Sequence, residues 1–346
     1  MRGIKLTNHA DKSTHRVWAL LGARAGDNDQ VIALAEALGS PFTAKPLHYN
    51  ALQALGPRLL GSSLASLRLA SRESLMQDPP PDLTISTGHR SVAVVRALRL
   101  RSGGQMRSIH LGFPRVSPAE FDLVITTPQY AIGDHPNVLR IPYALTRTVT
   151  DRNDEGSIAK LESLPSPKRL LIVGGPTLFW NLDREKLLQT LDAMLMEASA
   201  DGGSVLVTTS PRTPGPLRKE LASVLSKSGV STLLAEPGQP PTYPILLLIA
   251  DSIRVTADSV SMVSDAIWTR KPLALIPIAL SRPGRVIFAL HDWLRPGSRV
   301  YPQDLRFFWD ELGRMGITDK LALPTTTRSE MIAAVKARLR PLLAAT

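Results

Sequence analysis

The stretch VWALL-GARAGDNDQ-VIALAEAL, residues 17–38, decides how the rest of this chain is interpreted. Its first five residues are apolar, the next nine are small or polar and contain Gly22 and Gly26, and the last eight are rich in alanine and leucine. This order predicts a strand, a turn and a helix. It is the repeating unit of an α/β domain built on a parallel sheet.

The same pattern recurs along the chain. A strand at 83–86, a turn at 87–90 and a helix at 91–100 are followed by predicted strands at 106–111, 122–126 and 138–141. Beyond a polar segment at 148–168 the alternation restarts, with strands at 169–173, 204–209, 245–250, 252–255 and 272–277 and helices at 183–200, 217–226, 258–270 and 329–343. Regular alternation of strands and helices favours parallel sheets covered by helices on both faces.

Two domains are expected from the length, because 346 residues exceed what a single hydrophobic core usually supports. The polar segment at 148–168 is the best candidate for the linker between them. We therefore predict a flexible tail at 1–15, a first α/β domain at 16–150, a second at 168–325 and a C-terminal helix at 326–346.

The composition indicates an ordinary globular protein, with 43% hydrophobic and 21% charged residues. Cysteine is absent, which excludes a disulfide framework and a thiolate site and is typical of a reducing compartment. The polar start lacks the apolar core of a signal peptide, and the longest apolar run, 245–250, is too short to cross a bilayer. We expect a cytoplasmic protein.

The net charge of +11 favours anionic partners. Residues 83–119 contain no acid and six arginines, which form either a solvated basic face or a patch for phosphates or an anionic membrane surface. Nucleic acid is not an expected partner, because aromatic residues make up only 5% of the chain and no known nucleic-acid-reading motif accompanies the arginines. The six are Arg90, Arg96, Arg99, Arg101, Arg107 and Arg115.

The turns after the strands are the expected binding positions, because helix N-termini there present free N–H groups and partial positive charge. The first turn matches neither the dinucleotide motif nor the P-loop. It combines Gly26, where backbone can approach a ligand, with hydrogen-bonding groups at Asp27, Asn28 and Gln30. Its alternative interpretation is a helix N-cap made by Asp27 or Asn28.

The second half carries the more specific pattern. Arg212 and Thr213 follow a strand and suit a phosphate, since guanidinium groups bind phosphate oxygens in pairs. Hydroxyls at Ser259 and Ser261 either cap the next helix or donate to a phosphate at its start, and the Asp265 carboxylate can accept from both hydroxyls of a ribose. The Gly174-Gly175 turn after another strand is a weaker signal.

The seven histidines show no metal-ligand spacing, so we predict no protein-held metal. His89 and His110 lie at strand–turn positions, where each is either an acid or base or a hydrogen-bonded structural residue. The nucleophile-elbow motif of serine hydrolases is also absent.

These motifs resemble, in order, those of the bacterial relatives of the mitochondrial fission ELM1 proteins, a family to which glycosyltransferase activity is ascribed. The matching segments are GDNDQ at 26–30, TGHRS at 87–91, FDLV at 121–124 with TPQY at 127–130, GGP at 174–176, TSPRT at 209–213 and TADSVSMVSDA at 256–266. The last segment also resembles the nucleotide-sugar motif of the enzymes that make lipid II, in which a helix acid binds the donor ribose. Asp265 occupies that place.

The resemblance implies a GT-B fold, in which two Rossmann-like α/β domains face each other across a cleft. It implies a metal-independent glycosyltransferase without a cofactor, whose substrate is a nucleotide-diphosphate sugar and whose acceptor is an envelope glycolipid or a lipopolysaccharide-type, lipid-linked molecule at the inner membrane. Asp27 is then the candidate base. The expected donor-binding residues are Gly174, Gly175, Arg212, Thr213, Asp258, Ser259, Ser261, Met262 and Asp265, and the expected acceptor-side residues are Gly26, Asn28, Gln30, Gly88, His89 and Arg90.

Two other functions fit the same scaffold. A nucleotide-sugar epimerase would need a further acid/base pair near the sugar, and the sequence identifies none. A non-catalytic adaptor would need an exposed apolar patch. The candidate for that patch is Phe307-Phe308-Trp309, which is alternatively a buried helix face.

Overall fold

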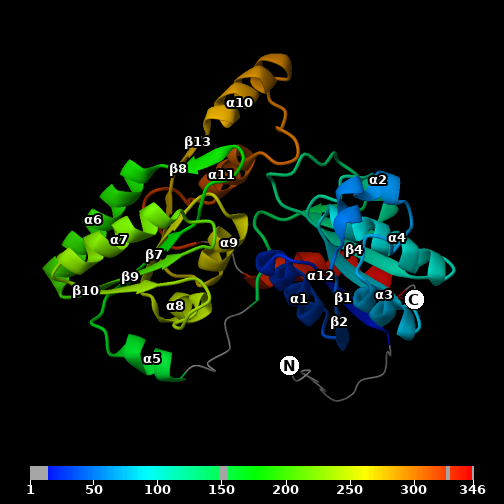
Figure 1. Ribbon diagram of the computed structural model, residues 1–346, viewed down its shortest axis with the longest axis horizontal. Coiled ribbons are helices and arrows are strands. Elements are labelled where there is room, and N and C mark those ends of the chain that lie inside the picture. The colour runs from blue at the N-terminus through cyan, green and yellow to red at the C-terminus, as the bar shows by residue number, and fades with distance from the viewer. Residues whose placement is uncertain (1–14, 148–154, 325–327, 345–346) are drawn as a thin grey trace. The chain divides into compact units, whose positions relative to one another are not determined.

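The computed structural model describes residues 15–147, 155–324 and 328–344, and these divide into two compact units (Figure 1). Unit 1 comprises the described residues up to Arg147, the short segment Tyr301–Gln303 and the C-terminal helix. Unit 2 comprises 155–300 and 304–324. Residues 1–14 of the tail predicted at 1–15, and the first part of the predicted linker, 148–154, lie outside the described residues. The rest of that linker contains a helix of unit 2, α5 (Glu155–Glu162).

Unit 1 is built on a six-stranded parallel sheet in the order β2-β1-β3-β4-β5-β6. Its central strands are almost entirely buried, because helices cover both faces of such a sheet, although β3 and β4 also carry polar residues. The strands are β1 (Val17–Leu21), β2 (Phe42–Pro46), β3 (Leu83–Thr87), β4 (Arg107–Leu111), β5 (Leu123–Thr126) and β6 (Val138–Arg140). The helices are α1 (Ala25–Leu38), α2 (Gly56–Leu60), α3 (Leu69–Gln77), α4 (Val92–Arg101) and α12 (Arg328–Ala344), with 3₁₀ turns at Ala51–Leu55, His89–Ser91 and Pro118–Glu120.

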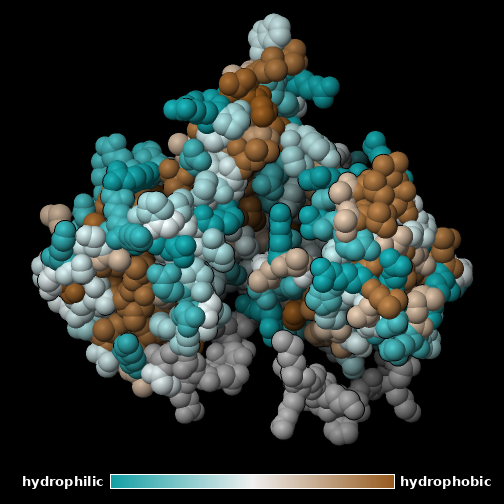
Figure 2. Space-filling view, in the orientation of Figure 1, coloured by the Kyte–Doolittle hydropathy of each residue, from teal (hydrophilic) through white to brown (hydrophobic). Residues whose placement is uncertain are grey.

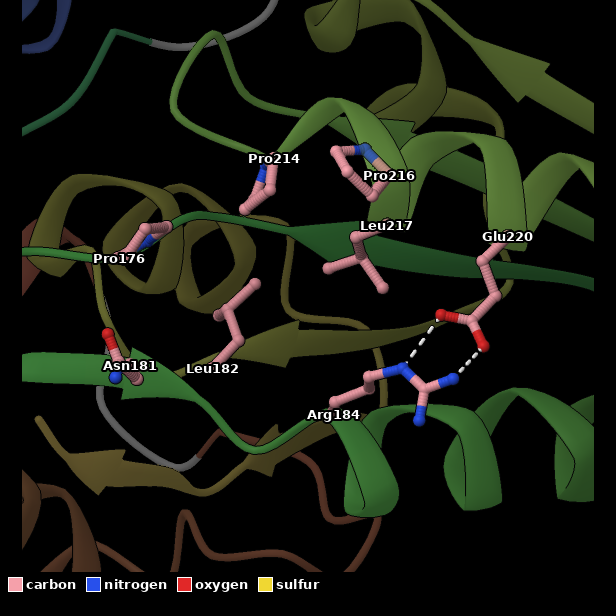
Figure 3. A pocket seen from close by; sticks show the side chains of 8 residues that line it. All are labelled: Pro176, Asn181, Leu182, Arg184, Pro214, Pro216, Leu217 and Glu220. Carbon is pink, nitrogen blue, oxygen red and sulfur yellow. Dashed lines mark hydrogen bonds and ion pairs between the residues drawn. The ribbon is translucent and has the colours of Figure 1, made fainter.

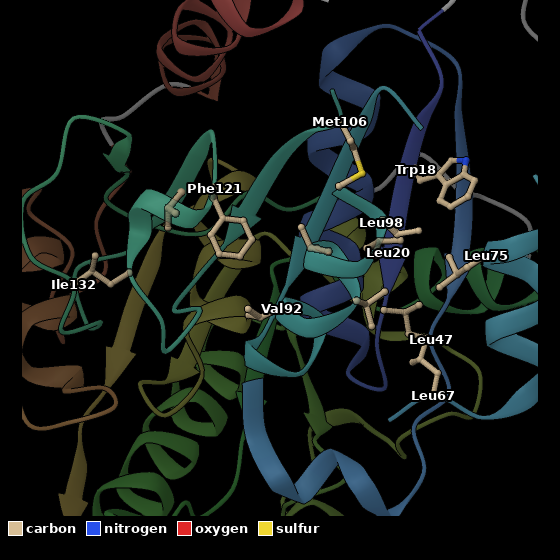
Figure 4. Packing of buried hydrophobic residues seen from close by; sticks show 13 residues of the cluster. Trp18, Leu20, Leu47, Leu67, Leu75, Val92, Leu98, Met106, Phe121 and Ile132 are labelled. Atoms are coloured by element: carbon tan, nitrogen blue, oxygen red, sulfur yellow. The ribbon is translucent and has the colours of Figure 1, made fainter. Parts of the chain in front are cut away.

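The core of unit 1 packs strand side chains against α3, α4 and the loops beside them (Figure 4). Trp18 and Leu20 of β1 meet Val92 and Leu98 of α4, and all four are almost completely buried. Burial of large apolar side chains contributes about 1.5–3 kcal/mol each. This core fixes the strand ends from which the turns of unit 1 project.

Unit 2 is built on a five-stranded parallel sheet in the order β10-β9-β7-β11-β12. Its strands are β7 (Lys168–Val173), β9 (Ser204–Thr209), β10 (Ser231–Ala235), β11 (Ser252–Thr256) and β12 (Leu273–Ile276). A separate antiparallel pair joins β8 (Trp180–Leu182) to β13 (Ile278–Leu280). Besides α5, its helices are α6 (Arg184–Asp201), α7 (Gly215–Lys227), α8 (Tyr243–Ile249), α9 (Val260–Trp268), α10 (Arg282–Leu294) and α11 (Leu305–Arg314).

The prediction of a strand at 245–250 is wrong, because these residues belong to helix α8 and its C-cap Ala250. A short apolar run has no periodicity that separates a buried strand from a buried helix. Pro244 stands in the first turn of α8, where its fixed φ angle favours a helix and its missing N–H costs nothing. The strand of this region is β11, which begins at Ser252.

Among the helices of the described residues, none combines the length and the apolar composition that crossing a membrane requires.

Candidate functional site

Three turns of unit 2 follow its central strands. The order β10-β9-β7-β11-β12 changes direction between β7 and β11, and ligands of doubly wound sheets bind beyond the carboxyl ends of the strands at such a switch point. The turn at 174–176 follows β7, and residues 257–259 follow β11. The turn at 210–214 follows β9, the neighbour of β7. The predicted donor-binding residues therefore lie in these three turns, at the carboxyl edge of one sheet, or in helix α9 that follows the last of them.

Asp258 joins these three turns. Its side chain is only 1% exposed, and its carboxylate accepts hydrogen bonds from the N–H of Gly175 (3.0 Å), from Nη2 of Arg212 (2.8 Å) and from the hydroxyl of Thr256 (2.6 Å). A buried carboxylate requires such donors, because it has lost its hydration. Asp258 therefore fixes the positions of the turns, and its oxygens already bind groups of this chain.

Arg212 is held at the surface of this cluster. Its Nη1 donates to the carbonyl oxygen of Gly175 at 2.8 Å, its Nη2 donates to Asp258, and the side chain is 43% exposed. A guanidinium fixed on one side and open on the other is preorganised for an anion. The predicted phosphate-binding group thus has a defined orientation over the turn after β7.

Neither glycine of the turn after β7 has room for a side chain. A Cβ atom on Gly174 would overlap the carboxylate of Asp258, and one on Gly175 would overlap the backbone of Arg212. Thr213 is buried and locks the same turn, since its hydroxyl lies 2.6 Å from the carbonyl oxygen of Gly174 and accepts from the N–H of Ser210 at 2.9 Å. These residues determine the path of the backbone at the site.

Helix α9 begins beside this cluster. Ser259 is its N-cap, accepting from the N–H of Met262 at 3.4 Å, so the capping interpretation is confirmed for Ser259. The Ser261 hydroxyl lies 3.2 Å from that of Ser259. Two hydroxyls therefore stand at the positive end of a helix.

Asp265 lies further along α9 and is half-buried. Its Oδ2 accepts from the phenol of Tyr243 in α8 at 3.2 Å. Desolvation and the neighbouring Asp265 raise the pKa of Tyr243 well above its ordinary value, so the phenol stays protonated and remains a donor. The carboxylate is thereby oriented by a residue that the sequence did not single out.

A cavity of about 520 Å³ opens beside the turns after β7 and β9 (Figure 3). Prolines and leucines supply most of its wall, and the ion pair of Arg184 with Glu220 (Nε to Oε2, 2.9 Å) forms one side. It neighbours the predicted donor-binding residues in sequence, but they do not line it. Its lining residues are Pro176, Asn181, Leu182, Arg184, Pro214, Pro216, Leu217 and Glu220.

Unit 1 has a corresponding switch point between β1 and β3. The turn after β1 leads into Gly26 and the first turn of α1, and Gly88, His89 and Arg90 follow β3. The residues predicted for the acceptor side are therefore grouped at two neighbouring strand ends.

The prediction that Asp27 or Asn28 caps α1 is wrong. The N-cap position is Arg24, whose side chain makes no capping hydrogen bond. Asn28 instead accepts from the N–H of Gly22 at 2.7 Å and donates to its carbonyl oxygen at 3.0 Å, which closes the turn after β1. Gln30 donates to the carbonyl oxygen of Gly26 at 3.3 Å. Asp27 lies in the first turn of α1, and its carboxylate does not cap the helix.

Two side chains at these strand ends of unit 1, Asp27 and His89, have shifted pKa values. Burial raises the pKa of the Asp27 carboxyl, and the positive charge of Arg24 partly opposes the rise. Burial and the charges of Arg115, Arg90 and Arg24 lower the pKa of His89 to about 4, so its imidazole is neutral near pH 7. A raised carboxyl pKa and a neutral histidine beside three arginines fit a site that removes a proton and holds an anion.

Four of the six arginines in the acid-free stretch are engaged within unit 1. Arg96 pairs with Glu120 (2.7 Å), and Arg99 and Arg107 both pair with Asp122. Arg101 donates to the carbonyl oxygens of Leu75 and Met76. Glu120 and Asp122 come just after residue 119, where the acid-free stretch ends, so counting charges within the stretch did not include them. These four arginines therefore do not supply the basic patch that was one of the two interpretations of this stretch.

His110 is a structural residue of β4. It is completely buried, its Nδ1 lies 3.1 Å from the hydroxyl of Ser86, and burial lowers its pKa to about 3. Of the two interpretations of this histidine, the structural one is confirmed.

The segment considered for an adaptor surface is a buried helix face. Phe308 of α11 is completely buried, and Trp309 is half-buried and donates from Nε1 to the carbonyl oxygen of Ala257 at 3.0 Å. This contact ties α11 to the start of α9.

Within residues 15–147, 155–324 and 328–344, no group of three or more His, Cys, Asp or Glu side chains is arranged to hold a metal ion.

Sequence reasoning missed Tyr243 and the joint action of Arg24 and Arg115 on His89. Tyr243 stands two residues before the run at 245–250, for which the sequence predicts a strand, so no local pattern places its phenol near Asp265. Arg115 is 26 residues from His89 in sequence, and only the strand order brings the two charges together.

Sequence comparison finds distant relatives of this chain. An uncharacterised protein of Rickettsia prowazekii is 21% identical over 294 residues, which cover 74% of this chain and 82% of that protein. The mitochondrial fission protein ELM1 of Arabidopsis thaliana is 24% identical over 238 residues, and the match spans 60% of this chain but only 53% of the plant protein.

Among solved structures, the UDP-GlcNAc 2-epimerase of Methanocaldococcus jannaschii superposes with a TM-score of 0.51 at 13% identity. The match covers 93% of this chain and 99% of that structure. The likeness shows a shared fold, so the chain has the two parallel-sheet, Rossmann-like domains of the GT-B type that the sequence predicted. The profile of the family described as Mitochondrial fission ELM1 matches residues 25–310, and this chain belongs to that family.

Proposed function

We propose that this protein is a glycosyltransferase that takes a sugar from a nucleotide-diphosphate donor bound by unit 2. The observation that carries the proposal is the junction made by Asp258, which joins the turns after β7, β9 and β11 at the switch point of the sheet and holds Arg212 beside the start of α9. A fixed guanidinium and a helix N-terminus at one point suit a diphosphate.

The donor would be held by few groups. Arg212 and the hydroxyls of Ser259 and Ser261 would donate to the diphosphate, and Asp265 would accept from the ribose hydroxyls while Tyr243 orients it. The cavity beside Pro176 and Pro214 would accommodate a ring of the donor, since its wall is mainly apolar and its polar groups are the Asn181 amide and the Arg184–Glu220 ion pair.

Transfer would follow from the same groups. An acceptor hydroxyl oxygen attacks the anomeric carbon of the donor sugar, the bond from that carbon to the diphosphate oxygen breaks, and the nucleoside diphosphate leaves with the electron pair. Arg212 and the N–H groups at the start of α9 would stabilise the charge that develops on the leaving group. The proton of the acceptor hydroxyl would pass to Asp27, whose raised pKa makes it a stronger base than an ordinary carboxylate.

The acceptor side would be unit 1. Arg24, Arg90 and Arg115 act together on His89 and would attract an acceptor that carries a negative charge, such as a lipid-linked or lipopolysaccharide-type glycan with phosphate groups. His89 itself stays neutral and would serve as a hydrogen-bonding group rather than as a cation.

The first test is a thermal-shift screen with UDP, GDP, CDP and ADP and their sugars, on the wild type and on Arg212→Ala and Asp265→Ala. Arg218→Ala, which breaks a surface ion pair with Glu236, is the matched control. We expect one nucleoside diphosphate to raise the melting temperature of the wild type and of Arg218→Ala, and to raise it less in the two site variants. If no nucleotide shifts the wild type at millimolar concentration, the proposal fails.

Product analysis then separates the reaction types. A transferase releases the nucleoside diphosphate when an acceptor is added, whereas an epimerase returns a changed sugar on the same nucleotide. An adaptor without a nucleotide site would give neither product.

A further inference from the structure

Helix α10 (Arg282–Leu294) presents large apolar side chains to solvent. Trp293 is 78% exposed and Val286 is 68% exposed, and Ile287, Leu290 and Leu294 are also exposed. Figure 2 shows hydrophobic surface along this helix, at the top of the view. Monomeric proteins seldom leave such a contiguous group uncovered, so it marks an interaction surface.

The helix is firmly held on its opposite side. Gly284 leaves no room for a side chain against the backbone of Phe179, and Phe288 is buried with its ring 5.2 Å from that of Trp180. Asp292 pairs with Arg306 of α11 (Oδ2 to Nη1, 2.6 Å). The contacts of α10 with the rest of unit 2 thus use one face of the helix, and the exposed apolar face points away from them.

The exposed apolar residues form one stripe. With about 100° between successive helical residues, the five fall within an arc of about 120°. Arg282 and Arg285, both exposed, lie on one side of this arc, about 20° and about 80° beyond its edge, and the exposed Arg295 follows the end of the helix. The one acid of α10, Asp292, is already paired. The surface is therefore apolar in the middle and positively charged at its border.

We propose that α10 lies flat on an anionic lipid bilayer, with its apolar stripe among the upper acyl chains and Arg282 and Arg285 at the headgroup phosphates. Tryptophan and arginine are typical of such interfacial helices. With 13 residues the helix is about 20 Å long, which is too short to cross the hydrocarbon core. A second copy of α10 is a poorer occupant, because it would bring further arginines and no free acid.

This surface differs from the basic patch that was one of two interpretations of residues 83–119, where the structure pairs four of the six arginines internally. It lies in unit 2, and the proposal holds whether or not unit 2 transfers a sugar.

The test is flotation of the full chain with vesicles of phosphatidylcholine and phosphatidylglycerol in equal parts, or of phosphatidylcholine alone. The wild type should float with the anionic vesicles and much less with the neutral ones. Leu290→Asp/Trp293→Asp should reduce the bound fraction at least about tenfold, since burial of each apolar side chain is worth more than a factor of ten. Met196→Asp, at an equally exposed apolar position of α6, should bind like the wild type.

A second pair of variants tests the charge. Arg282→Gln/Arg285→Gln should weaken binding about tenfold or more, since each basic residue near an anionic surface contributes a factor of about five. Lys219→Gln/Lys227→Gln changes the net charge equally at exposed positions of α7 and should leave binding within about twofold. Brominated acyl chains should quench part of the tryptophan fluorescence of the wild type, and Trp293→Phe should lose that part.

Three results would overturn the proposal. The first is a wild type that does not float with anionic vesicles, and the second is a set of α10 variants that float as well as the wild type. Alternatively, light scattering finds a wild-type dimer that Leu290→Asp/Trp293→Asp converts into a monomer while vesicle binding stays unchanged, in which case α10 is an interface between two copies.

Discussion

Arg212 and Asp258 form an ion pair of 2.8 Å between residues that are 46 positions apart in the chain. The carboxylate is almost completely buried, whereas the guanidinium is partly exposed. Because a buried charge must be met by donors, Asp258 draws together Arg212, Thr256 and the N–H of Gly175. The same pair therefore shapes the turn after β7 and orients the cation above it.

Removing the buried carboxylate should destabilise unit 2. Asp258→Ala leaves three donors without their acceptor, and we expect a loss of about 2–4 kcal/mol in the free energy of unfolding, less than for a fully buried pair because Arg212 reaches water. Urea denaturation measures this loss. Asp192→Ala, at an exposed position of α6, is the control and should change stability by less than about 0.5 kcal/mol. Equal stability of the two variants would show that the junction is not structural.

A single methyl group at the turn after β7 should have a large effect. The Cβ of Gly175→Ala would overlap the backbone of Arg212, so the turn must shift, at a cost of about 1–3 kcal/mol. Gly215→Ala adds the same methyl group in open space at the start of α7 and should be neutral. Thermal unfolding of both variants, with and without a nucleoside diphosphate, compares the two positions. An unchanged Gly175→Ala protein would contradict the close approach of the two turns.

Acid should destabilise unit 1 through His110. Its pKa is about 3 in the folded protein and about 6.5 when unfolded, so between these values the unfolded state binds the extra proton. Stability is therefore fully present above about pH 6.5 and falls as the pH drops, by about 2 kcal/mol between pH 7 and pH 5 from this residue. His110→Gln should show a correspondingly smaller drop in urea denaturation, whereas His48→Gln, at an exposed position, should match the wild type. A His110→Gln protein with the full wild-type drop would contradict this assignment.

The pKa of Asp27 should respond to Arg24. The charge of Arg24 lowers this pKa and partly offsets the effect of burial, so Arg24→Gln should raise it further. A ¹³C carboxyl titration by NMR, with the signal assigned by its loss in Asp27→Asn, measures the change directly. Arg58→Gln, at an exposed position of α2, should leave the titration unchanged. If Asp27 serves as the base, the acidic limb of the transfer rate moves to higher pH in Arg24→Gln as well.

The sequence predicted most strands of the two sheets and the helices α1, α4, α6, α7, α9 and α12, because apolar runs, glycine turns and helical periodicity are local signals. It failed at α8, where an apolar run of six has no distinguishing period. It placed Arg212 and Ser259 near one sheet edge, since the carboxyl ends of parallel strands meet there, and Asp265 in the helix that follows Ser259.

Ion pairs between residues far apart in the chain could not be predicted from the sequence. The acids that pair with Arg96, Arg99 and Arg107 stand just outside the acid-free stretch, and only the folded chain shows that they close on it. The sequence analysis predicted no helix at 282–294, and the apolar spacing of α10 alone would indicate a core-facing stripe. Only the fold shows that Gly284 and Phe288 face inward instead.

The central claim is that the Arg212–Asp258 junction of unit 2 binds a nucleoside diphosphate, and calorimetric titration tests it most directly. The nucleoside diphosphate found in the thermal-shift screen should bind the wild type and Arg218→Ala with equal affinity. It should bind Arg212→Ala at least about tenfold more weakly, since a charge-assisted hydrogen bond to phosphate is worth about 1.5–3 kcal/mol. Binding to Arg212→Ala with wild-type affinity, or no binding of any nucleoside diphosphate to the wild type, would contradict the claim.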